Sequence, residues 1–284
     1  MSEAGRLVLV ATPIGNLGDL SPRAVEALKG AHAVVCEDTR RTGRLFKHLG
    51  FASPRLIVAN EHTEWTARAD VLQLLATGST VCVVTDAGTP AISDPGAALV
   101  RAAIDQGHRV ETIPGPVAAI AALVISGLPT DRFAVEGFLP RTGSERRERI
   151  AALATDRAHT VVLYEAPHRL ARTLTDLSDA LGPDRRVVLA RELTKLHEET
   201  WRGTLAEAMA YTNDREPRGE YVIVIDRGAD TEPMGDDALT ARLTGLFGEG
   251  LTRRDAVDRV VADTGVARNR VYRLALHLET PGPN

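Results

Sequence analysis

The chain has 284 residues, of which 44% are hydrophobic and 25% are charged, so it is long enough for two domains with buried cores. Its formal net charge of −4 gives no overall attraction to a polyanion, and any contact with nucleic acid must come from local basic patches. Aromatic residues make up only 4% of the chain, which argues against a single-strand binder that stacks bases on aromatic side chains.

The two cysteines, Cys36 and Cys82, lie within apolar runs and lack the spacing that is typical of metal ligands. We therefore expect buried thiols in a reduced, intracellular protein without a metal site. The N-terminal segment lacks the basic start and long apolar stretch of a signal peptide, and no apolar run approaches the length that spans a bilayer. These features predict a cytoplasmic protein that does not contact a membrane.

A first α/β domain is predicted over residues 1–117. Short β-branched runs alternate there with helical patterns, as is typical of layers in which helices connect strands. Two helices have readable starts, because Ser21 and Asp94 each stand as an N-cap before a proline. Gly30 and Gly107 mark the ends of these helices. The predicted strands are RLVLVAT, HAVVCED, RLIVAN, TVCVVTD and HRVETIP.

A second α/β domain is predicted over residues 118–229. Its expected strands are FAVEGF, HTVVLYE, RRVVLARE and EYVIVID, and its helices lie near 144–154, 167–181 and 204–213. The segment 228–237 combines Gly, Pro and acidic residues, which indicates a linker.

Residues 237–284 are predicted to form three short helices, in a helix-turn-helix pattern. Thr252 and Asp255 have the spacing of a capping box at the start of the second helix. An alternative is a small helical cap that packs on the second domain, in which Val257, Val260 and Val271 are simply core residues.

Three loops rich in Gly and Pro lie between a predicted strand and a predicted helix: TPIGNLGD at 12–19, TDAGTPAISDPG at 85–96 and PGPVAAIAA at 114–122. Ligands of open α/β sheets bind beyond the carboxyl ends of the strands, and such loops bring the backbone close to a small molecule. The chain lacks GxGxxG after the first strand, GxxxxGK[ST], HExxH and GxSxG. From the residues alone we expect a two-domain α/β enzyme with a cleft for a polar small molecule, and the reaction stays open.

The motifs TPIGNLGDLSPRA, CEDTRRTGRL, VTDAGTPAISDPG, IPGPVAA, YEAPHRL and ARELTK occur in an order that resembles the 16S rRNA (cytidine-2′-O)-methyltransferase family. The resemblance extends from residue 7 to about residue 278 and includes the helical tail. It implies the tetrapyrrole methylase, or class III methyltransferase, fold with S-adenosylmethionine held between the two α/β domains. It also implies a homodimer that methylates a cytidine ribose in the decoding region of the small ribosomal subunit.

The resemblance also assigns residues to the cofactor pocket. The residues implied near the methionine and sulfonium end are Pro13, Asp86, Ala87, Gly88, Thr89, Pro114, Gly115, Ala118 and Ala119. Those implied to cover the adenosine are Tyr164, Arg191 and Gly219.

Methylation of a hydroxyl benefits from a base that accepts its proton. Candidates near the predicted strand ends are Glu37, Asp38, Glu165, His168 and Glu192. Each also has a purely structural interpretation: Glu37 and Asp38 could cap a helix, Glu192 could pair with Arg191 or Lys195, and His168 could be an exposed first-turn residue.

Two basic patches and three further arginines are the candidates for contacts with RNA phosphates, although such a patch is more often a solvated helix face than an RNA site. The candidate residues are Arg40, Arg41, Arg141, Arg146, Arg169, Arg268 and Arg270. Competing functions are a related methyltransferase that acts on a tetrapyrrole or a modified histidine, a non-catalytic ribosome-assembly factor and a nucleotide-binding dehydrogenase. The last would need a phosphate-binding fingerprint that the first strand–helix turn lacks.

Overall fold

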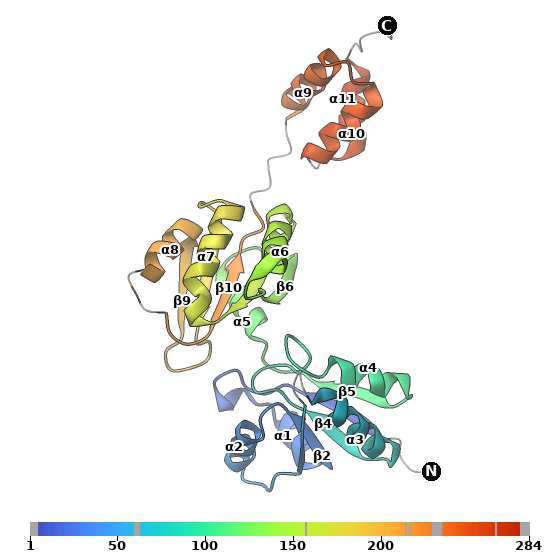
Figure 1. Ribbon diagram of the computed structural model, residues 1–284, viewed down its shortest axis with the longest axis vertical. Helices are drawn as coiled ribbons and strands as arrows, with labels where there is room; N and C mark the ends of the chain where they lie inside the picture. The colour runs from blue at the N-terminus through green and yellow to red at the C-terminus, as the bar shows by residue number, and fades with distance from the viewer. Residues whose placement is uncertain are drawn as a thin grey trace. The chain divides into compact units, whose positions relative to one another are not determined.

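A computed structural model of the chain describes residues 5–59, 63–156, 158–213, 215, 217–228, 235–264 and 266–278. The chain divides into two compact units, Met1–Asp226 and Arg227–Asn284. The larger unit contains two five-stranded sheets, and the smaller unit is helical (Figure 1). Within the described ranges, no helix is long and apolar enough to cross a membrane.

The first sheet is parallel and has the order β3-β2-β4-β1-β5. Each of its strands was predicted from the sequence, and the inner strands are short apolar runs, as is typical of parallel strands covered on both faces. The strands are β1 (Arg6–Val10), β2 (Ala33–Cys36), β3 (Arg55–Val58), β4 (Thr80–Val83) and β5 (Arg109–Ile113). The helices are α1 (Pro22–Lys29), α2 (Thr39–Leu49), α3 (Glu64–Ala76) and α4 (Ala97–Asp105), with a short 3-10 helix η1 (Leu17–Asp19).

Alternate residues of the strands supply two cores, one on each face of the first sheet. Leu7 packs on one face with Leu75 of α3 and Leu99 of α4, whereas Val8 packs on the other face with helices α1 and α2. Ser21 caps α1 as predicted, with its Oγ 3.2 Å from the backbone N of Ala24.

The prediction that Asp94 caps α4 is wrong. The helix begins at Ala97, its N-cap is Gly96, and no side chain caps it. Gly96 has a φ of +127°, a conformation that glycine adopts readily, and the backbone N of Ala91 donates to Pro95 O at 3.2 Å. This turn keeps Asp94 in the loop after β4, where it lines a cavity.

The second sheet is mixed and has the order β6-β7-β10-β8-β9, in which only the β6–β7 pair is parallel. The strands are β6 (Phe133–Phe138), β7 (Thr160–Glu165), β8 (Arg186–Arg191), β9 (Glu199–Thr204) and β10 (Tyr221–Ile225). The helices are α5 (Ala118–Ser126), α6 (Gly143–Thr155), α7 (Pro167–Leu181) and α8 (Leu205–Asn213). β9 was not predicted, because ETWRGT is a polar edge strand that its antiparallel pairing with β8 holds in place.

Helices α6, α7 and α8 cover one face of the second sheet, and α5 covers the other (Figure 1). Ala119, Ala122 and Leu123 of α5 are buried in the same cluster as residues of β7, β8 and β10. The predicted domain boundary between residues 117 and 118 therefore coincides with the helix that enters this core. It stays a prediction, because both sheets belong to the one compact unit Met1–Asp226.

The smaller unit consists, over its described residues, of helices α9 (Asp236–Gly248), α10 (Arg253–Thr264) and α11 (Arg268–Leu276). The expected core residues Val257, Val260 and Val271 are buried between these helices. One half of the predicted capping box forms, since the backbone N of Asp255 donates to Thr252 Oγ1 at 3.2 Å. The Asp255 carboxylate accepts from the Thr252 hydroxyl at 2.7 Å and not from the Thr252 backbone N. Most of the expected linker, residues 229–234, lies outside the described residues.

Candidate functional site

The three loops predicted to carry chemistry meet at one edge of the first sheet, because they follow the adjacent parallel strands β4, β1 and β5. Backbone hydrogen bonds join Thr12 to Gly88 in both directions, at 2.8 and 3.1 Å. Thr89 Oγ1 donates to Pro116 O at 3.1 Å. The expectation of a common edge is confirmed, and the loops form one connected floor.

A cavity of about 390 Å³ lies over this floor and is lined from both sheets. Its volume is in the range of roughly 300–1,000 Å³ that is usual for small-molecule sites. The first half of the larger unit contributes Ile14, Glu37, Arg41, Thr85–Thr89, Ile92–Asp94 and Val117. The second half contributes Ala118, Phe138, Tyr164–Pro167, Ala190, Glu192, Leu193, Lys195 and Glu220–Val222.

Gly88 lies at the centre of the floor and has a φ of +89°. A Cβ there would lie 3.5 Å from Ile14 Cγ2 and 3.7 Å from Pro116 O, which is ordinary contact. The need for glycine is therefore the left-handed backbone conformation and access to the cavity rather than a clash with the floor.

Three carboxylates gather on the first-sheet side of the cavity. Glu37 Oε1 accepts hydrogen bonds from Thr85 Oγ1 and, at 3.0 Å, from the backbone N of Asp86. Asp86 Oδ2 lies 3.4 Å from Arg41 Nε, while its buried Oδ1 has no hydrogen-bond partner among the described residues. Burial, with the Glu37 carboxylate adding to it, raises the pKa of Asp86 and raises the pKa of Asp94 to about 6.

Two cavity-lining loops are strained. Among the described residues, the non-glycine residues with positive φ are Ala91, Ser93, Glu192 and Thr194, with φ of 68°, 60°, 51° and 65°. Ser93 and Glu192 themselves line the cavity, and the others are two residues from them in the same loops. Such conformations cost about 1–3 kcal/mol each and persist where the surrounding structure fixes the backbone, often at functional sites.

The five predicted proton acceptors divide into two groups. Glu37, Glu165 and Glu192 line the cavity, whereas Asp38 and His168 do not. Asp38 is the N-cap of α2: it accepts from the backbone N of Arg40 at 2.8 Å and from Arg40 Nη2 at 2.9 Å. These hydrogen bonds lower the pKa of Asp38 to about 2, so Asp38 is better explained as a helix cap than as a proton acceptor.

The three glutamates at the cavity all have strong partners. Glu37 accepts from Thr85 and Asp86. Glu192 Oε1 lies 2.8 Å from Lys195 Nζ and 2.9 Å from the backbone N of Glu220. Glu165 is buried and is paired with an arginine of α7. Asp94 was missed as a site residue because its position before a proline and a glycine is also typical of a helix start.

The predicted cofactor residues also divide. The cavity is lined by Asp86, Ala87, Gly88, Thr89, Ala118 and Tyr164, and Pro13 lines a neighbouring cavity that shares Asp86 and Ala87. The remaining predicted residues, which do not line the cavity, are Pro114, Gly115, Ala119, Arg191 and Gly219. Lys195 lines both cavities and was not predicted, because nothing in the sequence places its loop against the first sheet.

Of the predicted RNA contacts, Arg146 is the one whose location argues against a direct role. Its side chain is 3% exposed and its guanidinium is committed to buried partners, so it is not available on the surface. Arg41 faces the cavity beside Asp86, Arg40 is exposed, and Arg169 is largely buried. In the helical unit, Arg268 pairs with Asp258 and Arg270 pairs with Asp236.

The family model, the curated relatives and the solved structure described here, all of which match this chain, are methylases or methyltransferases. The family model "Tetrapyrrole (Corrin/Porphyrin) Methylases" matches residues 6–209. Curated proteins called "Ribosomal RNA small subunit methyltransferase I" are 45% identical over 280 residues in Synechocystis sp. (98% of this chain, 100% of the relative) and 43% identical over 274 residues in Xylella fastidiosa (96% and 99%). The crystal structure of a uroporphyrin-III C-methyltransferase from Thermus thermophilus, complexed with S-adenyl homocysteine, has a TM-score of 0.54 at 20% identity. That alignment covers 78% of this chain and 97% of the other, and it shows a shared fold.

Proposed function

We infer the function from family membership, since this chain belongs to the ribosomal RNA small subunit methyltransferase I family, within the tetrapyrrole methylases. We propose that it transfers a methyl group from S-adenosylmethionine to the 2′-hydroxyl of a cytidine ribose in 16S rRNA. The observation that carries the proposal is the cavity that the loops of both sheets enclose, in a chain that matches these methyltransferases over nearly its full length.

The cavity suits the proposed methyl donor. Its volume of about 390 Å³ is adequate for a ligand of this size, and Gly88 exposes backbone on its floor. The carboxylates of Glu37, Asp86 and Asp94 favour a positively charged group such as a sulfonium. When bound, S-adenosylmethionine supplies a methyl group on a positively charged sulfur. The residues that would hold it are Asp86, Ala87, Gly88, Thr89, Ala118 and Tyr164, which line the cavity. The family resemblance assigns Pro13, Pro114, Gly115, Ala119, Arg191 and Gly219 to the same pocket.

The protein must also hold the ribose hydroxyl in line with the methyl carbon and the sulfur of the donor, and it must accept the proton of that hydroxyl. Positioning of this kind can contribute roughly 7–11 kcal/mol. We assign the proton to Asp94, which has a side-chain hydrogen bond with Thr85 but no ion pair with a described residue. Glu165 and Glu192 are paired with Arg169 and Lys195, and Glu37 accepts two hydrogen bonds from Thr85 and Asp86. A carboxylate whose pKa is about 6 is deprotonated near neutral pH and is more basic than an ordinary aspartate.

The RNA would enter past the basic side chains near the cavity. We propose Arg40, Arg41 and Arg141 as contacts to phosphates, with Arg268 and Arg270 of the helical unit as a second group. Arg169 supports this surface from a largely buried position. We further propose that the protein is cytoplasmic, where its RNA substrate is made, and that it works as a homodimer.

Labelled S-adenosylmethionine tests the proposal directly. The purified protein is incubated with small ribosomal subunits, free 16S rRNA or a corrin precursor, and label is measured in each. Label in RNA, found as 2′-O-methylcytidine by nucleoside mass spectrometry, is the expected result. Label in the corrin would instead favour a tetrapyrrole methyltransferase, and label in none, with tight binding to subunits, would favour a non-catalytic assembly factor.

A further inference from the structure

A second cavity, of about 330 Å³, lies at the start of α7 and shares no lining residue with the first. It is lined by Arg141, Arg146, His168, Arg169, Arg172 and Thr173. Four of these six side chains are guanidinium groups, in a chain whose net charge is −4. So strong a local concentration of positive charge calls for an explanation beyond general solubility.

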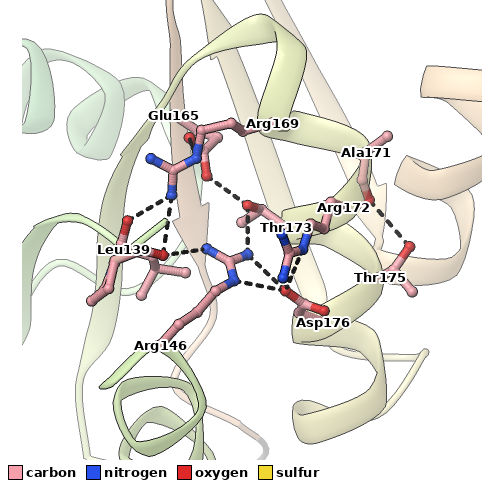
Figure 2. Close-up of polar contacts among 10 residues, drawn as sticks. Leu139, Arg146, Glu165, Arg169, Ala171, Arg172, Thr173, Thr175 and Asp176 are labelled. Carbon is pink, nitrogen blue, oxygen red and sulfur yellow. Dashed lines mark hydrogen bonds and ion pairs between the residues drawn. The ribbon is translucent and has the colours of Figure 1, made fainter. Parts of the chain in front are cut away.

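Arg146 is the buried lining residue of this cavity, and Figure 2 shows its guanidinium between Thr173 and Asp176. Its guanidinium donates to Asp176 Oδ2 at 2.8 Å, to Pro140 O at 3.0 Å and to Thr173 Oγ1 at 3.0 Å. Asp176 Oδ2 also lies 3.8 Å from Arg172 Nε. Arg146 is thus held by α7 and by the loop after β6. Its guanidinium stabilises the lining of the cavity and is not available to a ligand.

Glu165 and Arg169 form a second buried pair beside Arg146 and Asp176 (Figure 2). We call these four residues, together with Thr173, the buried frame of the cavity. Glu165 Oε1 lies 3.2 Å from Arg169 Nε, and Glu165 Oε2 accepts from Thr173 Oγ1 at 2.5 Å. Arg169 Nη2 donates to Leu139 O at 2.6 Å. Glu165 also lines the first cavity, so one buried carboxylate connects the walls of both.

The frame leaves donors available to a ligand. Four guanidinium charges face the two carboxylates of Glu165 and Asp176, which leaves an excess of positive charge at the cavity. The side chains of Arg141 and His168 make no hydrogen bond or ion pair with any described residue, and the Arg172 side chain is 60% exposed. An anion with several oxygens suits this donor set.

We propose that this second cavity binds a phosphate group of the RNA backbone, with Arg141, His168 and Arg172 as the contacting residues. The inference rests on the proposed function, because it supposes a ribose hydroxyl in the first cavity. Ala166 and Pro167 line the first cavity, and the next residue, His168, lines the second, so consecutive residues connect the two cavities. A 2′-hydroxyl in RNA always has a phosphodiester on the neighbouring carbon, and one substrate could therefore occupy both cavities.

The double variant R141Q/R172Q removes two of the proposed contacts and keeps the hydrogen bonds of Arg146 and Arg169; among the buried contacts it loses the 3.8 Å ion pair between Arg172 and Asp176. We expect its affinity for 16S rRNA to fall by at least about tenfold. The slope of log affinity against log salt should become shallower by about 1 for each lost phosphate contact. Arg147→Gln is the matched control, since Arg147 is exposed on the same helix as Arg146 but does not line the cavity. The affinity for S-adenosylmethionine, measured by calorimetry, should be unchanged in all variants.

RNA affinity and a salt slope equal to those of the wild type, in a double variant that still binds S-adenosylmethionine, would overturn the inference. Inorganic phosphate is the second probe, and it separates this outcome from failure of the proposed function. If the wild-type protein methylates no RNA but binds phosphate in a manner that R141Q/R172Q abolishes, the cavity is an anion site for another ligand and the RNA assignment is wrong. If phosphate binding is also equal in both proteins, the anion site itself is refuted.

Discussion

Thr12 and Gly88 exchange two backbone hydrogen bonds, with Thr12 N 2.8 Å from Gly88 O and Gly88 N 3.1 Å from Thr12 O. The loop after β1 is thereby fixed to the loop after β4, and the floor of the first cavity cannot move as two separate turns. Disturbing Gly88 should therefore affect the whole floor.

Gly88→Val is expected to abolish binding of S-adenosylmethionine while the fold survives. A valine at a φ of +89° is strained by about 1–3 kcal/mol, and its side chain would occupy space at the cavity floor. Gly107→Val is the control, because Gly107 has a similar φ of +76°, lies away from the cavity, and has no atom within 4 Å of the point where a Cβ would stand. Calorimetry that finds equal donor affinity in both variants would refute the placement of Gly88.

Asp94→Asn should reduce kcat by about 10²–10⁴-fold if Asp94 accepts the proton of the hydroxyl. In the wild type, activity should rise with pH through about 6, because burial raises the pKa of Asp94 to that value. The variant should lose this step in its pH profile while it still binds S-adenosylmethionine. Asp105→Asn, an exposed change on α4, is the control. A variant that keeps the rising profile would show that another group takes the proton.

The same substitution has a predicted effect on stability. The folded-state pKa of Asp94 lies above its ordinary value, so the unfolded state binds fewer protons and the carboxylate costs stability as pH rises through about 6. Asp94→Asn should therefore raise Tm at about pH 8 and change it little at about pH 4. Thermal unfolding at both pH values checks this sign, and the reverse order would contradict the buried environment of Asp94.

Arg146→Met should destabilise the larger unit by about 1–3 kcal/mol, because it removes the donors to Asp176, Pro140 O and Thr173 Oγ1. Arg149→Gln breaks an exposed pair with Glu136 and should cost no more than about 1 kcal/mol. Urea unfolding of the two variants measures the difference. Equal costs would mean that Arg146 is a surface cation after all.

Truncation after Arg227 should leave a folded protein that binds S-adenosylmethionine, because the smaller unit has a core of its own. We expect RNA affinity and methylation to fall, as the basic residues of α11 are lost. Methylation of small subunits and donor binding are measured side by side. Unchanged RNA affinity and methylation would mean that residues 237–284 have no role in RNA binding.

The order of strands and loops could be predicted because it depends on local pattern. Continuous apolar runs such as TVCVV and YVIVI form strands wherever they are buried on both faces, and proline after Ser21 starts a helix through its own fixed φ. The polar strand β9 could not be predicted this way, because only its partner β8 holds it in the sheet.

Motifs and periodicity are properties of neighbouring residues, and they were sufficient to predict the family, the two sheets and the three loops that meet at one edge. Which charges are available depends instead on the tertiary structure. Asp94 and Asp38 both precede helices in the sequence, yet a turn at Gly96 sends one into the cavity, while the other caps α2. Arg146 and Arg141 belong to the same basic segment, but Arg146 is buried against Asp176, which is 30 residues away. Burial and long-range pairing set the chemistry of each ionisable group, and neither can be read from its neighbours in the chain.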